Sequence, residues 1–249
     1  MKDRKLLGVL GGLGPMSSVY FYEMLTSHTY AERDQDHINI LISSRADTPD
    51  RTDFIVGRSN NNPLDSMKKE VDKLASAGAE LIAIPCNTAH YFYRGIAEKS
   101  KAPILNIIDE TVSFCKHLGL RRVGVLATEG TVLSGAYKEV LEREGIEYMS
   151  CSKEDQQKIS DIIYQDVKQG KEPDLDVFLE VADHLTAQGC ERIILGCTEL
   201  SLIKKKFRLG TRFIDSLEIL TLCAIVECGA TPCGFDAELL NFSKEKGRI

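Results

Sequence analysis

The sequence predicts an α/β protein made of two similar parallel-sheet domains of the flavodoxin-like type. A pseudo-twofold axis relates the domains, and a ligand-binding cleft lies between them. Three observations lead to this prediction. Short apolar runs alternate with segments of helical periodicity, the two halves of the chain align with each other, and similar polar motifs follow corresponding apolar runs in both halves. Alternating strands and helices are typical of a parallel sheet covered by helices.

The first half contains four short apolar runs that predict strands and two segments with the spacing of amphipathic helices. One of these helices ends at Gly78, and glycine is common just past a helix C-terminus. The predicted strands are residues 6–10, 38–42, 80–85 and 103–108, and the predicted helices are residues 17–29 and 67–78.

The second half repeats this alternation, with three apolar runs and two helical segments that each end at a glycine. The tail from Leu217 to Ile249 is predicted to be largely helical and to pack back on the first half. We therefore assign residues 1–110 plus 216–249 to the first domain and residues 111–215 to the second. The predicted strands are residues 122–127, 191–196 and 212–215, and the predicted helices are residues 135–145 and 175–188.

The two halves align in the same order over three blocks, which indicates an internal duplication. GVL occurs near the start of both halves, and glycine, glutamate and isoleucine recur together in the second block. This second block places Cys86 on Cys197. The aligned blocks are residues 8–10 with 124–126, 78–86 with 189–197, and 107–109 with 213–215.

Cys86 and Cys197 stand in similar motifs, IPCNTAH and LGCTEL. Each is expected at the carboxyl end of a strand, where ligands of open parallel sheets bind. Two domains that face each other would direct both thiols into one cleft. Thr88 and Thr198 follow the cysteines and predict capped helix starts, whose free amides would favour a thiolate and hold a substrate carboxylate.

The composition argues against several classes of protein. The chain has 249 residues, 43% of them hydrophobic, and a formal net charge of −6. Basic residues do not interleave with aromatic ones, so we expect no nucleic-acid partner. The apolar run near the N-terminus is short, and no stretch approaches the roughly 20 apolar residues of a membrane span. We therefore expect a cytoplasmic, soluble protein that does not bind membranes.

Eight cysteines are present, and without a secretory signal we expect them to be reduced. No CxxC pair occurs, and the spacing of Cys223, Cys228 and Cys233 matches no common zinc site. For these three we favour the role of small buried hydrophobic residues. We expect no bound metal.

Two thiols at one ligand could form a redox pair, bind a soft metal, or act as an acid and a base. A redox pair usually has its partner close in sequence, and His90 is the only further candidate metal ligand near either cysteine. Acid–base chemistry accounts best for the pattern. A thiolate on one face of a carbon removes a proton, a thiol on the other face donates one, and the stereocentre inverts.

Five motifs spread over nearly the whole chain resemble those of the aspartate/glutamate racemase family, whose amino-acid racemases use no cofactor. The resemblance implies two α/β domains, a homodimer, an amino-acid substrate and no pyridoxal phosphate. GGLGP and GCTEL resemble the aspartate racemase branch, whereas glutamate racemases typically carry a histidine where Glu199 stands. The motifs are GVLGGLGP at 8–15, PDRT at 49–52, PCNTAH at 85–90, ATEGT at 127–131 and GCTEL at 196–200.

The same resemblance implies roles for individual residues. Cys86 and Cys197 match the two catalytic bases, the first serving the D-enantiomer and the second the L-enantiomer. Arg51 matches an arginine that grips the side-chain carboxylate of the substrate, and Lys168 resembles the lysine that joins it. The residues that match positions holding the α-carboxylate and amino group are Asn87, Thr88, Thr128 and Thr198.

Several residues keep more than one interpretation. Gly12 and its neighbours lack the third glycine of a dinucleotide fingerprint, so we interpret Gly12 as part of a turn that lets the backbone approach the ligand. His90 is a third catalytic group or a packing residue at a helix start. Glu199 orients a thiol, binds the substrate ammonium or stabilises a first helical turn. Taken alone, Arg51 is a surface loop residue and Lys168 is a solvated helical one.

Three functions remain open. A racemase of aspartate, with glutamate or a broader range of amino acids as further substrates, accounts best for the matched cysteines. Another carbanion enzyme of the same superfamily, such as a hydantoin racemase, maleate isomerase or arylmalonate decarboxylase, would act on different substrates. An amino-acid-binding protein without turnover is the third function, and the two intact cysteine motifs argue against it.

Overall fold

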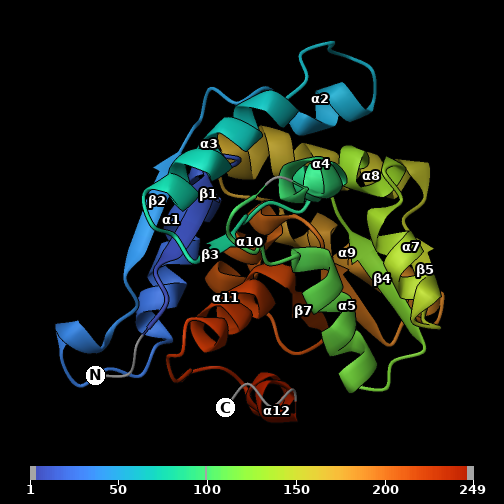
Figure 1. Cartoon of the computed structure of the whole chain (residues 1–249). Helices are drawn as coiled ribbons and strands as arrows, with labels where there is room; N and C mark the ends of the chain where they lie inside the picture. Colours follow the sequence, from blue (N-terminus) through green and yellow to red (C-terminus); the bar gives the residue numbers. More distant parts are fainter. Residues whose placement is uncertain (1–3, 99, 246–249) are drawn as a thin grey trace.

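The computed structural model describes residues 4–98 and 100–245 and contains two parallel sheets (Figure 1). The first sheet has the strand order β2-β1-β3, and the second has the order β5-β4-β6-β7. The first three strands of each half therefore have the same order, which confirms the prediction of two similar parallel-sheet domains. The strands are β1 (Leu7–Gly11), β2 (Ile40–Ser44), β3 (Leu81–Ala83), β4 (Arg122–Leu126), β5 (Glu147–Ser150), β6 (Arg192–Leu195) and β7 (Phe213–Asp215).

Helices pack on both faces of each sheet, because strands joined by helical crossovers bury both of their faces. The predicted helices are all present, close to their predicted bounds. The α-helices are α1 (Pro15–Ser27), α2 (Arg51–Ile55), α3 (Leu64–Ser76), α4 (Tyr93–Ala97), α5 (Ile107–His117), α6 (Glu129–Leu133), α7 (Ala136–Arg143), α8 (Lys153–Asp161), α9 (Leu175–Ala187), α10 (Thr198–Phe207), α11 (Ser216–Glu227) and α12 (Ala237–Glu245). Shorter or irregular helical segments are η1 (Asp34–Asp36), η2 (Thr88–Phe92), η3 (Ile162–Asp166) and η4 (Val167–Gln169).

The strand predicted at 103–108 is wrong. Ile104 makes one isolated bridge to Ile82, and α5 already begins at Ile107. Asn106 caps this helix, because its side chain accepts hydrogen bonds from two amides of the first turn. The cap ends the extended segment although the residues after it have strand-like side chains. The edge strand β5 was not predicted, since half of its residues are exposed and its sequence lacks an apolar run.

The third aligned block is also wrong. Residues 107–109 begin a helix, whereas residues 213–215 form strand β7. The equivalent positions are instead Asn106 and Asp215, since both side chains cap a helix. Asn106 caps α5 just after the extended residue Ile104, and Asp215 caps α11 at the end of β7. The other two blocks agree with the sheets, because β1 corresponds to β4 and β3 to β6 in strand order.

Helix α11 lies in the apolar core that the two halves share. It is buried along nearly its whole length, and it packs against α1, α5 and α10. The helical tail therefore packs back on elements of the first half, while its last residues, 246–249, lie outside the described residues. The predicted boundary between residues 110 and 111 falls inside α5.

Two glycines at equivalent positions let the two domains approach each other closely. Gly14 follows β1, and a Cβ atom there would collide with the carboxylate of Glu199 from the other half. Gly130 follows β4, and a Cβ atom there would lie 2.8 Å from the Cα atom of Thr52 in the first half. The carboxyl ends of the two sheets therefore face each other across a cleft lined from both sides.

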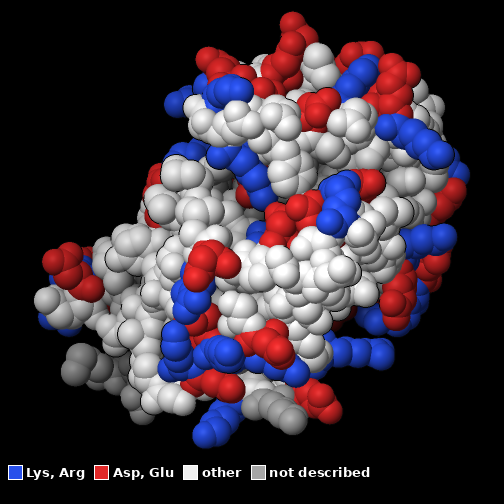
Figure 2. Space-filling model, turned by 90° about the horizontal axis from the view of Figure 1, so that it is seen from above, with Lys and Arg blue, Asp and Glu red and all other residues white. Residues whose placement is uncertain are grey.

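Within the described residues, the helices are all too short or too polar to cross a membrane. Figure 2 shows Lys and Arg side chains interspersed with Asp and Glu side chains on the face seen from above. Charges of both signs are scattered over that face among uncharged residues, whereas a nucleic-acid-binding surface is typically an extended basic patch.

Replacing Gly130 by alanine should destabilise the protein by about 1–3 kcal/mol, because the new methyl group overpacks against the backbone of Thr52. Alanine is the better helix former, so a loss of stability at this helical position would report the contact between domains. Urea unfolding measures the change. The control is Gly210→Ala, since a Cβ atom there meets no atom of the described residues within 4 Å; equal stability of Gly130→Ala and wild type would contradict the expectation.

Candidate active site

Cys86 and Cys197 follow β3 and β6 and line the same small cavity, here called the inner chamber. Its volume is about 10 Å³, which is room for about one water molecule. Both cysteines are buried. The structure thus brings the two thiols into one chamber with walls from both domains. The chamber is lined by Leu13, Asp50, Arg51, Thr52, Cys86, Asn87, Thr88, Thr128, Tyr164, Lys168, Cys197, Thr198 and Glu199.

Both thiols are held in the protonated form by this closed environment. Burial raises the pKa of Cys86, and the positive charge of Arg51 opposes this only in part. Burial also raises the pKa of Cys197 well above its usual range, and the Glu199 carboxylate raises it further. Cys197 Sγ donates a hydrogen bond to Glu199 Oε2 at 3.0 Å. The backbone amides of Ala89 and Glu199 lower the pKa values of Cys86 and Cys197, as expected of helix-end amides, but burial outweighs them in the ligand-free site.

Thr88 and Thr198 are not the helix caps that the sequence predicted. The N-cap positions are occupied by Asn87 before η2 and by Cys197 itself before α10. Thr198 Oγ1 instead donates a hydrogen bond to the carbonyl of Pro85 in the other half, at 3.2 Å. This hydroxyl therefore joins the two cysteine-bearing loops to each other.

Thr88 belongs to a cluster of three hydroxyls that spans the two halves. Its Oγ1 lies 2.9 Å from Thr128 Oγ1 and 2.9 Å from Thr131 Oγ1, and the latter two lie 3.0 Å apart. Thr128 also caps α6 by accepting a hydrogen bond from the Thr131 amide at 3.2 Å. Each hydroxyl can donate and accept, so the cluster can turn toward a carboxylate or an ammonium group.

Asn87 has a fixed orientation because both ends of its amide are bonded. Tyr137 donates its hydroxyl to Asn87 Oδ1 at 2.7 Å, and Asn87 Nδ2 donates to Ser216 Oγ at 3.0 Å. Ser216 in turn donates to the carbonyl of Leu195 at the end of β6. Asn87 therefore links the cysteine loop of the first half to the strand that precedes the second cysteine.

Arg51 is the first residue of α2 and is buried. Its guanidinium donates hydrogen bonds to the carbonyls of Thr48 at 3.3 Å, Pro49 at 3.1 Å and Leu13 at 2.8 Å. Its Nε meets no hydrogen-bond partner among residues 4–98 and 100–245. A buried N–H that the protein leaves unpaired favours an acceptor supplied by a ligand. The interpretation of Arg51 as a surface loop residue is therefore wrong.

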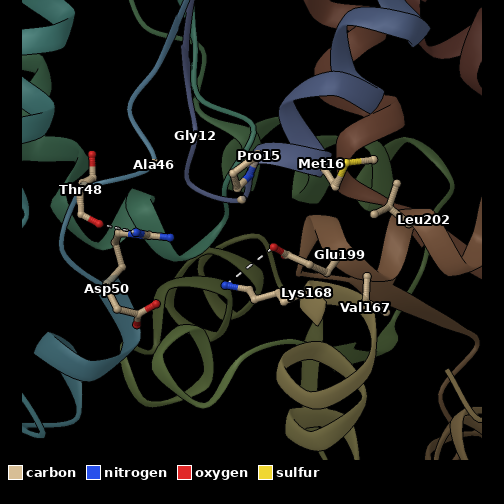
Figure 3. A pocket seen from close by; sticks show the side chains of 12 residues that line it. Gly12, Pro15, Met16, Ala46, Thr48, Asp50, Val167, Lys168, Glu199 and Leu202 are labelled. Carbon is tan, nitrogen blue, oxygen red and sulfur yellow. Dashed lines mark hydrogen bonds and ion pairs between the residues drawn. The ribbon is translucent and has the colours of Figure 1, made fainter. Parts of the chain in front are cut away.

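A larger pocket of about 420 Å³, here called the outer pocket, adjoins the inner chamber (Figure 3). The two cavities share Asp50, Arg51, Lys168 and Glu199. Figure 3 shows Lys168 and Glu199 pointing toward each other, with Nζ and Oε1 3.8 Å apart. This ion pair stands at the border of the two cavities. The outer pocket is lined by Gly12, Gly14, Pro15, Met16, Ala46, Thr48, Asp50, Arg51, Val167, Lys168, Glu199 and Leu202.

Lys168 lies on η4, directly after η3, a π-helix of the kind frequent at functional sites. Burial lowers the pKa of Lys168, but Glu199 and the other acidic groups around the ammonium together outweigh burial, so the net pKa is raised. Its ammonium also lies 4.7 Å from the centre of the Tyr164 ring. Lys168 is therefore a charged group of the cleft and not a solvated helical lysine.

Gly12 and His90 shape the loops around the chamber. Gly12 lines the outer pocket with a positive φ of 83°, and a Cβ atom there would lie 2.5 Å from the Arg45 amide nitrogen. His90 Nε2 accepts a hydrogen bond from the Ile107 amide at 3.3 Å, and Nδ1 lies 2.8 Å from the Cys86 carbonyl. Burial lowers the pKa of His90. These contacts favour the packing interpretation, in which a neutral imidazole holds the Cys86 loop.

The sequence analysis missed three residues in or beside the chamber, of which Asp50 and Tyr164 line it and Thr131 contacts its threonine residues. Asp50 stands inside the PDRT motif, so the motif could have pointed to it. Thr131 lies in the ATEGT motif, next to the predicted Thr128. Tyr164 carried no signal, because a π-helix cannot be recognised from side-chain periodicity. Within the described part of the chain, no group of three or more His, Cys, Asp or Glu side chains is arranged to hold a metal ion.

Comparison with known protein families identifies the family. The model described as Asp/Glu/Hydantoin racemase matches residues 10–224. The chain therefore belongs to the Asp/Glu/hydantoin racemase family, as its motifs predicted.

Individual relatives cover most of the chain. The broad specificity amino-acid racemase RacX of Bacillus subtilis (strain 168) is 29% identical over 219 residues, which cover 85% of this chain and 92% of RacX. The structure of Picrophilus torridus aspartate racemase matches with a TM-score of 0.77 and 30% identity, over 92% of this chain and 96% of that one. A glutamate racemase from Francisella tularensis in complex with D-glutamate, at 19% identity and a TM-score of 0.60 over 99% of this chain and 84% of that one, shares the fold.

Replacing Glu199 by glutamine should lower the pKa of Cys197. The glutamine amide still offers an oxygen to the thiol, but it lacks the negative charge that raises the pKa of Cys197 in the wild type. The measurement is the ultraviolet absorbance of the thiolate during a pH titration, taken as the difference between each protein and its Cys197→Ser version. An unchanged or higher titration midpoint in Glu199→Gln would contradict this electrostatic role.

Proposed function

We propose that the protein is an amino-acid racemase that inverts the α-carbon of aspartate with two cysteines and without pyridoxal phosphate. The observation that carries the proposal is the placement of Cys86 and Cys197, at equivalent strand ends of two similar domains, in one chamber. The shared family and the aspartate racemase among the structural relatives support it.

In the proposed reaction, one cysteine as a thiolate removes the proton from Cα, and the other cysteine as a thiol donates a proton to the opposite face. One S–H bond forms and the other breaks, so the enzyme emerges with its two protonation states exchanged. The reverse reaction starts from that second state. Carbanion character at Cα is stabilised by fixed positive charge and hydroxyl dipoles, here Arg51, Lys168 and the threonine cluster.

The raised pKa values of both thiols mean that the ligand-free site must first ionise one of them. Glu199 is placed to take the proton of Cys197, since its Oε2 already accepts a hydrogen bond from that sulfur. The ammonium of Lys168, close to the same carboxylate, lowers the pKa of Cys197 in part. We assign Glu199 the role of a proton acceptor that prepares Cys197 for catalysis.

A substrate with a side-chain carboxylate fits the cations of the site. The free Nε–H of Arg51 and the ammonium of Lys168 both border the chamber, and a carboxylate can accept from both. The inner chamber of about 10 Å³ is too small for an amino acid. Its walls must therefore move apart on binding, and the Lys168–Glu199 pair is the contact that a substrate carboxylate would disrupt.

A broader substrate range is the second candidate, and one observation favours it. The outer pocket of about 420 Å³ extends beyond Lys168 toward apolar walls that include Met16 and Leu202. This volume exceeds what a single carboxymethyl side chain fills, so longer side chains could enter it. RacX, the relative named above, is described as a broad specificity amino-acid racemase.

Isotope incorporation tests the two-base mechanism. With L-aspartate in D₂O, a chelator and no pyridoxal phosphate, we expect early D-aspartate to carry deuterium at Cα and recovered L-aspartate to carry none. The thiol that donates to the product exchanges with solvent, whereas the base on the substrate face retains the proton it removed. Chiral chromatography with mass spectrometry measures both enantiomers.

The matched variants are Cys86→Ser, Cys197→Ser and Cys233→Ser. The first two should lower kcat/KM by about 10³-fold or more, because each removes a group that acts in the chemical step. Cys233 is only partly buried and lies outside both cavities, so its variant should keep full activity. Unlabelled D-aspartate, or loss of activity in all three variants, would refute two-cysteine inversion.

Arg51→Lys separates the two substrate ranges. If Arg51 binds the side-chain carboxylate, the variant should raise KM for aspartate by about 10-fold or more, because lysine lacks the fork of N–H groups. KM for a neutral amino acid such as methionine should change little. Steady-state kinetics measures KM for both substrates. An equal change in KM for aspartate and for methionine would mean that Arg51 does not bind the substrate side chain.

A further inference from the structure

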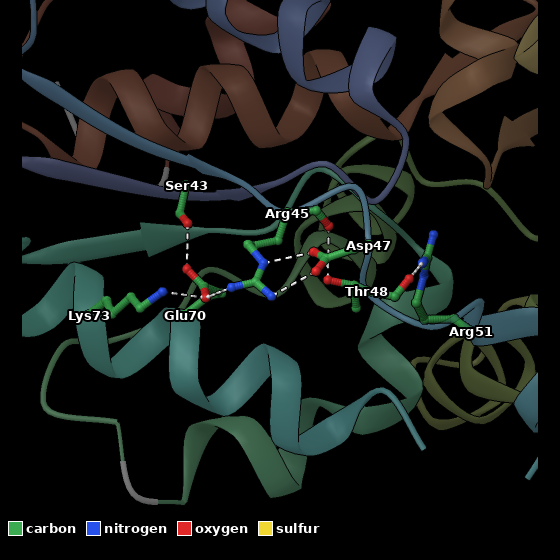
Figure 4. A network of polar contacts seen from close by, with 7 residues as sticks. All are labelled: Ser43, Arg45, Asp47, Thr48, Arg51, Glu70 and Lys73. Atoms are coloured by element: carbon green, nitrogen blue, oxygen red, sulfur yellow. Dashed lines mark hydrogen bonds and ion pairs between the residues drawn. The ribbon is translucent and has the colours of Figure 1, made fainter. Parts of the chain in front are cut away.

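A network of polar contacts extends from Glu70 to the loop that holds Arg51 (Figure 4), and its part around Glu70 lies outside both cavities. At its centre is Glu70 of α3, whose side chain is only 3% exposed. Its Oε2 accepts a hydrogen bond from Ser43 at 2.6 Å, and its Oε1 accepts from Lys73 at 2.7 Å and from Arg45 at 3.1 Å. Three donors around one buried carboxylate form an anchor that links α3 to the loop after β2.

Arg45 is the point where two loops of the site meet. Its amide donates to the carbonyl of Gly11 at 3.2 Å, and its backbone packs so closely on Gly12 that a Cβ atom there would collide with it. Its carbonyl accepts hydrogen bonds from the amide of Thr48 at 3.3 Å and from the hydroxyl of Thr48 at 2.9 Å. The backbone of Arg45 therefore fixes the turn after β1 and the loop that leads to α2.

The same two loops supply every carbonyl that holds Arg51 in the described structure. Thr48 and Pro49 belong to the loop before α2, and Leu13 belongs to the turn after β1. Since these acceptors are backbone atoms, the direction of the guanidinium follows the position of both loops. A shift of Arg45 would move both sets of acceptors at once.

We propose that Glu70 is a positioning residue for Arg51, which it orients through Arg45 and the two loops that Arg45 joins. The proposal rests on the proposed function in one respect, namely that Arg51 binds the side-chain carboxylate of the substrate. Glu70 touches neither cavity, so it acts on the site only through other residues. Its effect should fall on substrate binding and leave the proton transfers at the cysteines intact.

Burial distinguishes Glu70 from the other carboxylate that Arg45 contacts. Asp47 lies 2.8 Å from Arg45 Nε, but its side chain is 72% exposed. Water screens the exposed Asp47 carboxylate, whereas the buried Glu70 carboxylate holds its donors in a less polar environment. Asp47 holds the Arg45 side chain with two hydrogen bonds, at 2.8 and 2.9 Å, but it belongs to the same loop, whereas Glu70 joins Arg45 to α3. Loss of Asp47 therefore leaves the link between the loop and α3 in place.

A double-mutant cycle tests the proposal. Glu70→Gln should raise KM for aspartate by about 10-fold and leave kcat within about twofold, because the anchor loses its charge while the shape stays the same. In an Arg51→Met background, the same Glu70→Gln change should have almost no further effect on KM. The matched control is Asp47→Asn, which removes the exposed partner of Arg45 and should leave KM within about twofold.

Hydrogen exchange of the backbone adds a readout that needs no activity. In Glu70→Gln, the segment 44–51 should exchange faster than in the wild type, while β4 and β6 keep their protection. If Glu70→Gln fails to fold, Arg45→Lys serves instead, since lysine keeps the charge but lacks the planar fork of N–H groups that reaches Glu70 and Asp47 together. It should shift KM in the same direction by a smaller factor.

Each outcome decides one claim. The positioning role is wrong if Glu70→Gln raises KM by the same factor with and without Arg51. It is also wrong if Asp47→Asn raises KM as much as Glu70→Gln does, or if the segment 44–51 exchanges at the wild-type rate in Glu70→Gln. A fall in kcat at unchanged KM overturns it as well. A wild-type protein that racemises no amino acid refutes the proposed function instead, and the exchange of 44–51 alone then decides whether Glu70 holds the loop.

Discussion

The close approach of the two strand-end edges is the constraint on which the rest of the site depends. Gly14 and Gly130 lack side chains at two points where a Cβ atom would collide with the opposite domain. This approach leaves the inner chamber with space for about one water. Dry surroundings raise the pKa values of Cys86 and Cys197, so the geometry that aims two sulfurs at one place also keeps them protonated.

The charged residues at the border of the two cavities connect substrate binding with the pKa of Cys197. In the ligand-free structure, Lys168 faces Glu199, and Glu199 accepts the hydrogen bond of Cys197. A substrate carboxylate that draws Lys168 toward itself would leave Glu199 with less positive charge nearby. The same movement would remove a charge that lowers the pKa of Cys197, so the protonation of this thiol depends on the position of Lys168. Binding of an acidic side chain and ionisation of a thiol would thus be coupled through one lysine.

The sequence predicted those parts of the molecule that depend on local pattern. The equivalence of Cys86 and Cys197 follows from strands and helices that repeat in order, and the fold confirms that order. Hydrogen bonds between distant segments could not be predicted. Tyr137 and Ser216 hold Asn87 from elements 50 and 129 residues away, and no periodicity encodes such contacts. The helix cap at Asn106 likewise overrode an apolar run that reads as a strand.

Under the proposed function, the positions of these residues separate the chemistry from the choice of substrate. The two cysteines follow the buried strands β3 and β6 within three residues, so the backbone there has little freedom. Arg51 instead depends on carbonyls of two loops, and loops vary and move more than strands. A change in the anchor of those loops could therefore redirect the guanidinium while both sulfurs stay in place. On this argument, proteins of this family can keep one proton-transfer geometry and still differ in the side chains they accept.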